Sequence, residues 1–367
     1  MRIQAAVVTD ASTPFRLEDV ELDEPRHDEV LVKVVATGIC QTDAHVWHQH
    51  IPAPLPIVLG HEGAGVVEQV GSSVTTLKPG DHVVMSYQAC GRCERCLTGS
   101  PAYCDNAFTA NFSGARLDGT SGWRRGSASE DGVHGHFFGQ SAFATHVLAT
   151  ERNTVKVPTD LPLELLGPLG CGLQTGAGAI LNSFQVPVGA SVAVFGTGAV
   201  GLAAIMAARV AGAAPVVGVD VNPDRLTLAA ELGATEVLNA ATADVTAELM
   251  RITGTGVDYI LDTTGRSDML EHAVNSLAPM GQAGLVAHAP GLSVPVAKLA
   301  RGKTVRGIIQ GDAIPQQFIP RLLQMYRSGR FPFDRLVRFY DFQDINAAFA
   351  EAASGGVIKP VLRIASV

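Results

Sequence analysis

The sequence predicts an α/β protein of two domains: a discontinuous β-rich domain, and a doubly wound parallel sheet. Three observations lead to this fold class. A chain of 367 residues is long enough for roughly two domains. Short β-prone runs separated by Pro and Gly turns occupy about the first 150 residues. Between residues 173 and 308, apolar strand-like runs alternate with helical runs, which is typical of a parallel sheet.

The β-rich zone is marked by valine-rich runs that end near glycine or proline. The clearest are EVLVKVVAT (residues 29–37), GAGVVEQVG (63–71) and DHVVMSY (81–87). The Gly- and Ser-rich residues 112–135 are expected to form a long surface loop and not a linker between domains. Because the C-terminal run KPVLRI resembles this zone again, we predict one domain formed by residues 1–172 and 309–367.

Residues 173–308 are predicted to form the inserted parallel-sheet domain. Its elements are expected in the order strand 191–196, helix 200–212, strand 215–220, helix 225–234, strand 259–265 and strand 281–288. The apolar residues near 192–208 approach the length of a membrane span, but Gly196, Gly198 and Gly201 interrupt them. A buried strand, turn and helix is therefore the better interpretation.

Composition argues against several classes of function. Hydrophobic residues make up 47% of the chain and charged residues 17%, which favours large cores over disorder. The net charge of −8 is spread along the chain without a basic block, so nucleic acid is not an expected partner. The N-terminal residues lack the basic and apolar regions of a secretory signal, and we expect a cytoplasmic protein without a membrane partner.

The segment GTGAVG (residues 196–201) fits the dinucleotide-binding pattern G-x-G-x-x-G, between a predicted strand and a predicted helix. Gly196 permits a tight turn, Gly198 lets a pyrophosphate approach the helix N-terminus, and Gly201 allows close packing of helix and strand. Asp220, at the end of the next predicted strand, can bind ribose hydroxyls and would repel a 2′-phosphate. The pattern predicts NAD binding in preference to NADP; a glycine-rich packing turn is the alternative.

Four of the six cysteines, Cys90, Cys93, Cys96 and Cys104, lie within fifteen residues. In a reducing compartment such clusters are more often metal ligands than disulfides. The spacing C-x2-C-x2-C-x7-C offers enough thiolates to close a tetrahedral zinc site. A [4Fe–4S] cluster is one alternative, although its usual run places the fourth cysteine at x3 before a proline; free or disulfide-bonded thiols are the other. We expect structural zinc in a lobe of about residues 88–106.

Cys40, His61 and Cys171 lie in three distant segments, GICQTDAH, LGHEGAGVVEQVG and GPLGCGLQTGAG. Two cysteines and one histidine would leave the fourth position of a zinc ion open, which is the condition for catalysis. Taken singly, each residue also fits a buried structural role, since free cysteines commonly pack as small apolar side chains. The residues alone leave both interpretations open.

These three segments, the four-cysteine loop and GTGAVG occur in the order found in zinc-containing medium-chain alcohol dehydrogenases. The chain resembles this family over essentially its whole length. The resemblance implies a GroES-like catalytic domain with an inserted Rossmann NAD-binding domain, and a homodimer or homotetramer. It also implies two Zn2+ ions per chain: a catalytic zinc on Cys40, His61 and Cys171, and a structural zinc on the four clustered cysteines.

The resemblance further implies roles for residues around the catalytic zinc. Thr42 matches the hydroxyl residue that takes the alcohol proton, and His45 matches a histidine that passes the proton to solvent. Asp43 matches the carboxylate that orients the zinc-bound histidine. Glu62 matches an acid beside the zinc, for which a packing salt bridge is the alternative.

Cofactor contacts are implied in the same way. Lys359 matches a basic residue that contacts the pyrophosphate, and Arg225 and Arg266 fall where the family has basic residues on the adenosine and phosphate sides. The other cofactor residues implied by the resemblance are Thr175, Ala199 and Val200. Gln41 departs from the Arg or His that several animal members place on the pyrophosphate, which puts the affinity for the cofactor in doubt.

The predicted reaction is the reversible oxidation of a primary alcohol to its aldehyde, with zinc lowering the pKa of the alcohol and NAD accepting a hydride. Residues 137–149 and 163–178 look most like the branch that acts on aryl and allylic alcohols, and the small Ser86 leaves room for a bulky substrate. The S-(hydroxymethyl)glutathione or formaldehyde branch is the alternative. A non-enzymatic protein stabilised by zinc and NAD is the alternative from another class, against which the open zinc position argues.

Overall fold

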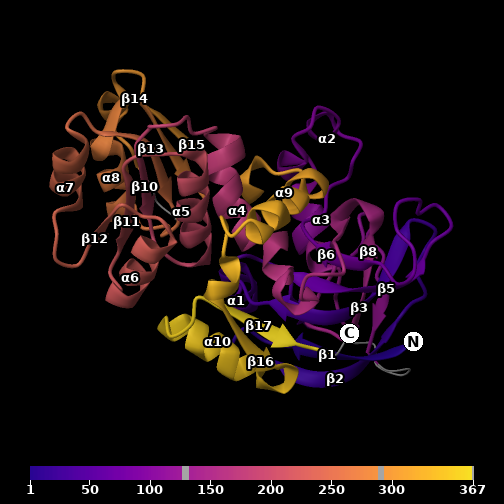
Figure 1. Ribbon diagram of the computed structural model, residues 1–367. Coiled ribbons are helices and arrows are strands. Elements are labelled where there is room, and N and C mark those ends of the chain that lie inside the picture. Colours follow the sequence, from indigo (N-terminus) through magenta and orange to yellow (C-terminus); the bar gives the residue numbers. More distant parts are fainter. Residues whose placement is uncertain (126–131, 288–292, 366–367) are drawn as a thin grey trace. The chain divides into compact units, whose positions relative to one another are not determined.

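A computed structural model describes residues 1–125, 132–287 and 293–365 of the chain (Figure 1). The chain divides into two compact units. Unit 1 comprises Met1–Cys171, Ile314–Pro320 and Asp334–Val367, and unit 2 comprises Gly172–Ala313 and Arg321–Phe333. The β-rich unit is thus discontinuous, and the helix Pro315–Arg327 (α9) is shared between the two units, at a point where the sequence pattern places no boundary.

Unit 1 is built mainly from two sheets. One has the strand order β4-β1-β2-β7, and the other has the order β16-β17-β3-β5-β6-β9, with β8 paired to β3. The strands are β1 Arg2–Val8, β2 Arg16–Leu22, β3 Glu29–Gly38, β4 Ile57–Val58, β5 Gly63–Val70, β6 His82–Met85, β7 Trp123–Arg124, β8 His146–Thr150, β9 Thr154–Lys156, β16 Val337–Asp341 and β17 Lys359–Arg363. The α-helices are α1 Gln41–Trp47, α2 Glu94–Leu97, α3 Ala107–Phe112 and α10 Ile345–Ser354.

The strand β3 organises the larger sheet of unit 1. Nearly every residue of this valine-rich strand is buried, and both of its edges are paired: β5 lies along one edge, and β8 and β17 share the other. The pairing with β17 joins Ala36–Gly38 to Val361–Arg363. The C-terminal strand therefore completes a sheet that begins near residue 29, as the similarity of KPVLRI to the first zone suggested.

Unit 2 contains one parallel sheet of order β12-β11-β10-β13-β14-β15. The strands are β10 Val192–Phe195, β11 Val216–Asp220, β12 Glu236–Asn239, β13 Val257–Asp262, β14 Leu277–Leu285 and β15 Thr304–Gly307. The helices are α4 Gly172–Gly178, α5 Ala199–Ala211, α6 Pro223–Leu232, α7 Val245–Thr253 and α8 Ser267–Ser276. The helix α5 packs on α6, and α7 packs on α8 (Figure 1). This strand order is that of the dinucleotide-binding fold and confirms the predicted fold class.

Burial explains the apolar segment that approached the length of a membrane span. All four residues of β10 are buried, and so are the residues of α5 from Gly201 to Ala208. A strand covered on both faces and a helix packed within a core both need continuous apolar sequence. Among the helices of the described residues, none is long and apolar enough to cross a membrane.

The described part of residues 112–135 has more regular structure than the predicted surface loop. Trp123 pairs with β2 and is only 2% exposed, and Val133 is also buried. Residues 126–131 of this stretch lie outside the described residues. The Gly and Ser content suggested a loop because turn residues surround the buried anchor at Trp123, which has no periodic pattern around it.

Candidate active site

Asp43, in the helix α1, connects two of the other predicted site residues, Cys40 and His61. Cys40 is the N-cap of α1, and Asp43 Oδ2 accepts a hydrogen bond of 2.9 Å from the Cys40 backbone N–H. The other carboxylate oxygen, Oδ1, accepts from the Gly60 backbone N–H at 3.1 Å and from His61 Nδ1 at 2.9 Å. A single buried carboxylate therefore fixes both Cys40 and His61 in place.

Two phenylalanine rings pack against the imidazole of His61, and Gln140 binds its backbone. Phe138 stacks on it at 4.4 Å between ring centroids, and Phe137 meets its edge at 5.4 Å. The side chain of Gln140 donates to the carbonyls of His61 and Ser86, both at 3.1 Å. Because Nδ1 is bonded to Asp43, Nε2 is the ring nitrogen of His61 that remains available as a metal ligand.

Cys40, His61, Glu62 and Cys171 offer ligand atoms that lie within 4.8 Å of one another, although the residues are up to 131 positions apart in the sequence. His61 is fully buried, and its Nε2 has no hydrogen-bond partner within the described residues. An unpaired buried nitrogen next to two thiols is costly unless a metal ion takes it. The donor set of two sulfurs and one imidazole nitrogen fits zinc.

The ionisable side chains of this cluster shift one another's pKa values. A hydrogen bond from Cys171 holds the pKa of the Cys40 thiol well below its ordinary value, against the effect of burial and with help from His61 and Lys359. Burial favours a neutral His61, but Asp43 and Cys40 outweigh burial and raise the pKa of His61 well above its ordinary value. A proton therefore competes with a metal for this site.

Glu62 and Lys359 form a buried ion pair. Lys359 Nζ lies 2.9 Å from each carboxylate oxygen of Glu62 and also donates to the Ile39 carbonyl at 3.0 Å. The two side chains are only 0% and 3% exposed. This is the packing salt bridge weighed above as the alternative for Glu62. The predicted contact of Lys359 with a pyrophosphate stays a prediction, since all three of these bonds stay within unit 1.

The predicted proton-relay residues follow Cys40 along α1. Thr42 Oγ1 lies 3.8 Å from Cys40 Sγ, at the edge of the proposed metal site. His45 Nδ1 lies 3.3 Å from the Nδ1 of the exposed His50. Thr42 and His45 thus both lie on α1, and His45 contacts the exposed His50 just beyond this helix, a residue to which no sequence motif assigns a role.

The four clustered cysteines of unit 1 also converge, with sulfur atoms within 4.8 Å of one another. Cys93 Sγ lies 3.9 Å from Cys104 Sγ, close to the ~3.8 Å that separates two sulfurs in a tetrahedral zinc site. Backbone N–H groups of Cys90 and Asn106 donate to Cys104 Sγ at 3.3 and 3.4 Å. The arrangement fits a zinc ion closed by four thiolates, which would hold together a loop with little helix or strand of its own.

In unit 2, the glycine-rich turn adopts the geometry that its sequence predicts. Gly196 has φ of +86°, which other residues rarely adopt. A Cβ atom on Gly201 would lie 1.8 Å from the Gly196 carbonyl oxygen, so only glycine fits there. Gly198 is the N-cap of α5, and a Cβ there would meet nothing within 4 Å. The N-terminus of α5, with Ala199 and Val200, is therefore open to a phosphate group.

Asp220 closes this turn from the end of β11. Its Oδ2 accepts from the Thr197 backbone N–H at 2.6 Å and from Thr197 Oγ1 at 2.9 Å, and its Oδ1 accepts from the N–H groups of Val221 and Asn222. Burial alone would raise the pKa of Asp220, but these bonds outweigh it and lower the pKa below its ordinary value. The residue is therefore an anion that is bound to the turn.

The other predicted cofactor residues of unit 2 are more scattered. Arg225 lies in the first turn of α6, and Thr175 lies in α4, which approaches α5 so closely that a Cβ on Gly176 would lie 1.9 Å from the Val200 carbonyl oxygen. Arg266 precedes α8, is exposed, and forms a two-point ion pair with Asp268 at 3.0 and 2.8 Å. The roles of these residues in cofactor binding remain predictions.

Comparison with known proteins matches both units to one family. Residues 26–159 match the family described as alcohol dehydrogenase GroES-like domain, and residues 199–328 match the zinc-binding dehydrogenase family. A geraniol dehydrogenase from Castellaniella defragrans is 47% identical over 365 residues, which cover 98% of this chain and 97% of that protein. The chain belongs to the zinc-containing medium-chain alcohol dehydrogenase family.

Solved structures of this alcohol dehydrogenase family share the fold. An alcohol dehydrogenase zinc-binding domain protein from Burkholderia ambifaria is 50% identical with a TM-score of 0.97, and each chain is fully covered. A benzyl alcohol dehydrogenase from Acinetobacter calcoaceticus is 46% identical with a TM-score of 0.95, again with full coverage of both chains. Membership of the family implies the use of zinc and of a nicotinamide dinucleotide, NAD or NADP.

Two residues of the alcohol dehydrogenase site were missed by the sequence reasoning. Gln140 is fully buried and, besides its two donor bonds, accepts from the Gly63 backbone N–H at 3.1 Å. Phe138 stacks on His61 from a backbone with φ of +54°. Neither has a local sequence signal, because a lone buried Gln or Phe in a turn matches no pattern of spacing.

Proposed function

We propose that this chain is an NAD-dependent zinc alcohol dehydrogenase that interconverts a primary allylic or aromatic alcohol and its aldehyde. The observation that carries the proposal is the buried set of Cys40, His61 and Cys171, in which His61 Nε2 lacks a protein partner. The substrate class is supported by relatives at 47% and 46% identity over nearly the whole chain, whose names specify geraniol, an allylic alcohol, and benzyl alcohol.

Cys40, His61 and Cys171 would hold the catalytic zinc, and the four clustered cysteines would hold a second, structural zinc. The catalytic ion supplies a Lewis acid that makes an alcohol hydroxyl easier to deprotonate, and NAD supplies the hydride acceptor. Asp43 keeps the His61 ring in the tautomer and orientation that direct Nε2 toward a metal. Glu62 adds a negative charge behind the site, which Lys359 neutralises.

The proton of the alcohol is carried away by groups of α1. The Thr42 hydroxyl accepts this proton and donates its own, because a hydroxyl can do both at once. His45, which also lies on α1, then takes the proton, since a neutral imidazole has one ring nitrogen that can accept it. The pairing of His45 Nδ1 with the exposed His50 offers the route to water. In this scheme the protein positions the substrate and moves the proton, and the cofactor accepts the hydride.

NAD is the proposed cofactor because the anionic Asp220 lies at the end of β11, where it would repel a 2′-phosphate. We also propose that the enzyme is a homodimer or homotetramer of the cytoplasm. All six cysteines are free, which suits a reducing compartment in which thiolates remain metal ligands.

The test is a comparison of kcat/KM for geraniol, cinnamyl alcohol and benzyl alcohol with that for ethanol, read from NADH absorbance with the zinc-loaded chain. The larger alcohols should exceed ethanol by at least about a hundredfold, since each buried CH2 is worth about 0.8 kcal/mol. His61→Ala should abolish turnover, whereas the exposed His48→Gln should leave it unchanged. Activity confined to formaldehyde with glutathione, or no turnover of any alcohol by a chain that retains zinc, would refute the proposal.

A further inference from the structure

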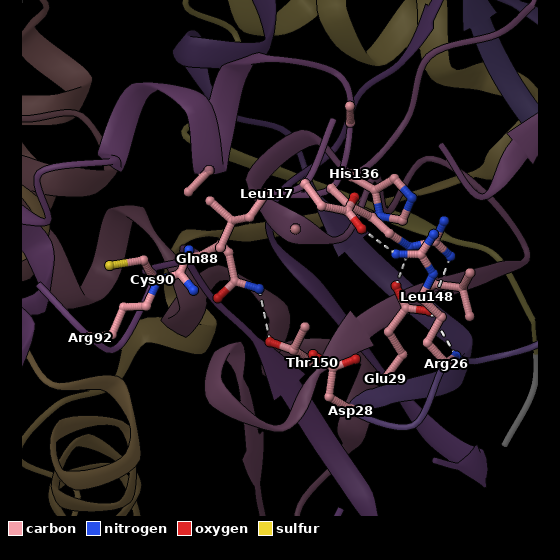
Figure 2. Close-up of a pocket in the computed structure, with 15 residues that line it drawn as sticks. Arg26, Asp28, Glu29, Gln88, Cys90, Arg92, Leu117, His136, Leu148 and Thr150 are labelled. Carbon is pink, nitrogen blue, oxygen red and sulfur yellow. Dashed lines mark hydrogen bonds and ion pairs between the residues drawn. The ribbon is translucent and has the colours of Figure 1, made fainter. Parts of the chain in front are cut away.

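Unit 1 contains a pocket of about 320 Å3 that includes none of the residues of the proposed catalytic zinc site (Figure 2). In Figure 2, Cys90 and Arg92 lie at one end of the view and Arg26, Glu29 and His136 at the other. Its volume falls at the small end of the range for ligand sites. Cys90 of the four-cysteine cluster is among the residues that line it, but no sequence motif accounts for the other residues of the pocket.

Two acids of the pocket already have partners. Arg116 binds Glu29 at two points, through Nε at 2.5 Å and Nη2 at 3.1 Å. Arg26 Nη1 binds Asp118 at 2.7 Å. Glu29 and Asp118 are therefore each paired with an arginine, and Asp28, the third acid of the lining, is exposed. The pocket also contains two hydrogen-bond donors without acceptors.

The first such donor is the remaining nitrogen of Arg116. The Arg116 side chain is 8% exposed, and its Nη1 is buried without a hydrogen-bond partner within the described residues. Arg116 is among the residues that line the pocket. A buried guanidinium N–H without an acceptor costs free energy, so an acceptor from outside the protein is expected there.

The second donor is His136, whose ring is almost fully buried. Burial first, and then the positive charges of Arg116 and Arg26, lower the pKa of His136 to about 3, so the ring is neutral at physiological pH. Its Nε2 accepts from the Gly122 backbone N–H at 3.2 Å, which puts the ring proton on Nδ1. No bond from Nδ1 to another group occurs in the described parts of the chain.

Part of the remaining wall is apolar and is formed by Ala110, Ala115, Leu117 and Leu148, while Asp28, Gln88, Arg92 and Thr150 add polar groups. The pocket therefore combines two unsatisfied donors with a hydrocarbon surface. A water molecule could accept from these donors but would bring two hydrogens of its own. A carboxylate accepts from several donors and brings none.

We propose that this pocket binds a small monocarboxylate with a short apolar chain, whose oxygens accept from Arg116 Nη1 and His136 Nδ1. The hydrocarbon part packs against Leu117 and Leu148. Arg92, an exposed guanidinium at the pocket, adds favourable charge. The site is separate from the alcohol chemistry and does not depend on it.

The experiment measures binding of butyrate to the zinc-loaded full chain without NAD, by titration calorimetry and thermal unfolding, at an ionic strength held constant with chloride. Butyrate should bind saturably with one site per chain and raise the midpoint of unfolding. Arg116→Lys keeps a cation for Glu29 but removes Nη1, and should weaken binding about tenfold to a hundredfold. Arg124→Gln is the matched control, because Arg124 is exposed, pairs with Asp23 and does not line the pocket.

A second variant guards against misfolding of Arg116→Lys. Leu117 is 41% exposed, so Leu117→Glu should fold normally while its charge repels a carboxylate. The proposal would be overturned if either folded variant bound butyrate with the same affinity as wild type. It would also be overturned if butyrate bound only at the proposed catalytic zinc. Absence of saturable butyrate binding by wild type, or binding of inorganic phosphate in its place, would also overturn it.

Discussion

Lys359 and Glu62, which are 297 positions apart in the sequence, form a buried ion pair. Burial raises the pKa of Glu62 to about 7 although Lys359 opposes this, whereas Glu62 keeps the pKa of Lys359 above its ordinary value despite burial. The pair lies directly behind Cys40 and His61, so its charge balance is part of the electrostatics of the proposed zinc site.

Lys359→Met should destabilise the protein by about 3–5 kcal/mol, because it leaves the Glu62 carboxylate buried without a cation. The double variant Glu62→Gln with Lys359→Met should recover part of this loss. Urea unfolding gives the free energies, with Arg363→Met as control, since Arg363 lies on the same strand in an exposed pair with Glu164. A single variant as stable as wild type would show that the pair contributes nothing.

The two proposed zinc sites should differ in how readily they lose metal. The four-thiolate site is closed, whereas the site of Cys40, His61 and Cys171 keeps an open position that a chelator can enter. Elemental analysis should give two zinc ions per chain, and mild chelation should remove one together with activity while circular dichroism stays unchanged. Cys171→Ser should retain the structural zinc. Iron, or a single zinc in the untreated protein, would contradict both assignments.

Thr42 and His45 should fail in different ways. Thr42→Ala removes the first proton acceptor and should reduce kcat by roughly 10²–10⁴, whereas Thr42→Ser keeps a hydroxyl and should remain active. His45→Gln removes only the step that passes the proton toward solvent. Its loss of kcat should be smaller than that of Thr42→Ala, greater at low pH, and partly restored by concentrated buffer base. Steady-state kinetics against pH and buffer concentration distinguish these cases; an unchanged profile in His45→Gln would mean that the residue has no role in the relay.

Asp220 should determine the choice between NAD and NADP. Asp220→Ser removes the charge that faces a 2′-phosphate and should shift the ratio of kcat/KM values toward NADP by a factor of ten or more. Because Asp220 also accepts bonds from Thr197, Val221 and Asn222, the variant's thermal unfolding should be recorded as a control for the turn. A wild-type enzyme that prefers NADP would contradict the assignment.

His136 should make the protein sensitive to acid. Its pKa is about 3 in the folded protein and 6.5 in the ordinary state, so the unfolded chain binds more protons between these values. Stability from this group is full above about pH 6.5 and falls by about 1.4 kcal/mol per pH unit as the pH drops toward 3. The groups that act on it are Arg116, Arg26, Asp118 and Asp23. Unfolding of His136→Gln across this range should show a shallower loss than that of wild type or of His48→Gln.

Local patterns predicted much of the fold. In unit 2, hydrophobic periodicity predicted β10, α5, β11, α6, β13 and β14 but not α4, β12, α7, α8 or β15. The turn at Gly196 follows from a spacing that only a strand, tight turn and helix satisfy. The four clustered cysteines could be grouped because they are neighbours in the sequence. By contrast, Cys40, His61 and Cys171 could be grouped only through the family resemblance, because no spacing rule joins segments so far apart.

What the sequence did not reveal depends on tertiary contacts. Gln140 satisfies three backbone groups of two separate segments, residues 61–63 and Ser86, and its role appears only when these segments meet. The bonds of Lys359 to Glu62 and to the Ile39 carbonyl could not be predicted, because 297 positions separate Lys359 from Glu62; its contact with a pyrophosphate stays a prediction. The pocket beside Arg116 could not be predicted, because a buried donor without an acceptor becomes visible only in the tertiary structure.

The pairing of β17 with β3 also sets an order of events during synthesis on the ribosome. The six strands of unit 2, from β10 to β15, emerge as a continuous stretch and can form their sheet at once. Ala36–Gly38 must wait for Val361–Arg363, roughly 16–65 s later at about 5–20 residues per second. Until then the nascent chain exposes an open strand edge that invites pairing with other chains. Unit 1 therefore cannot complete its larger sheet until β17 has been synthesised, whereas all six strands of unit 2 are available well before then.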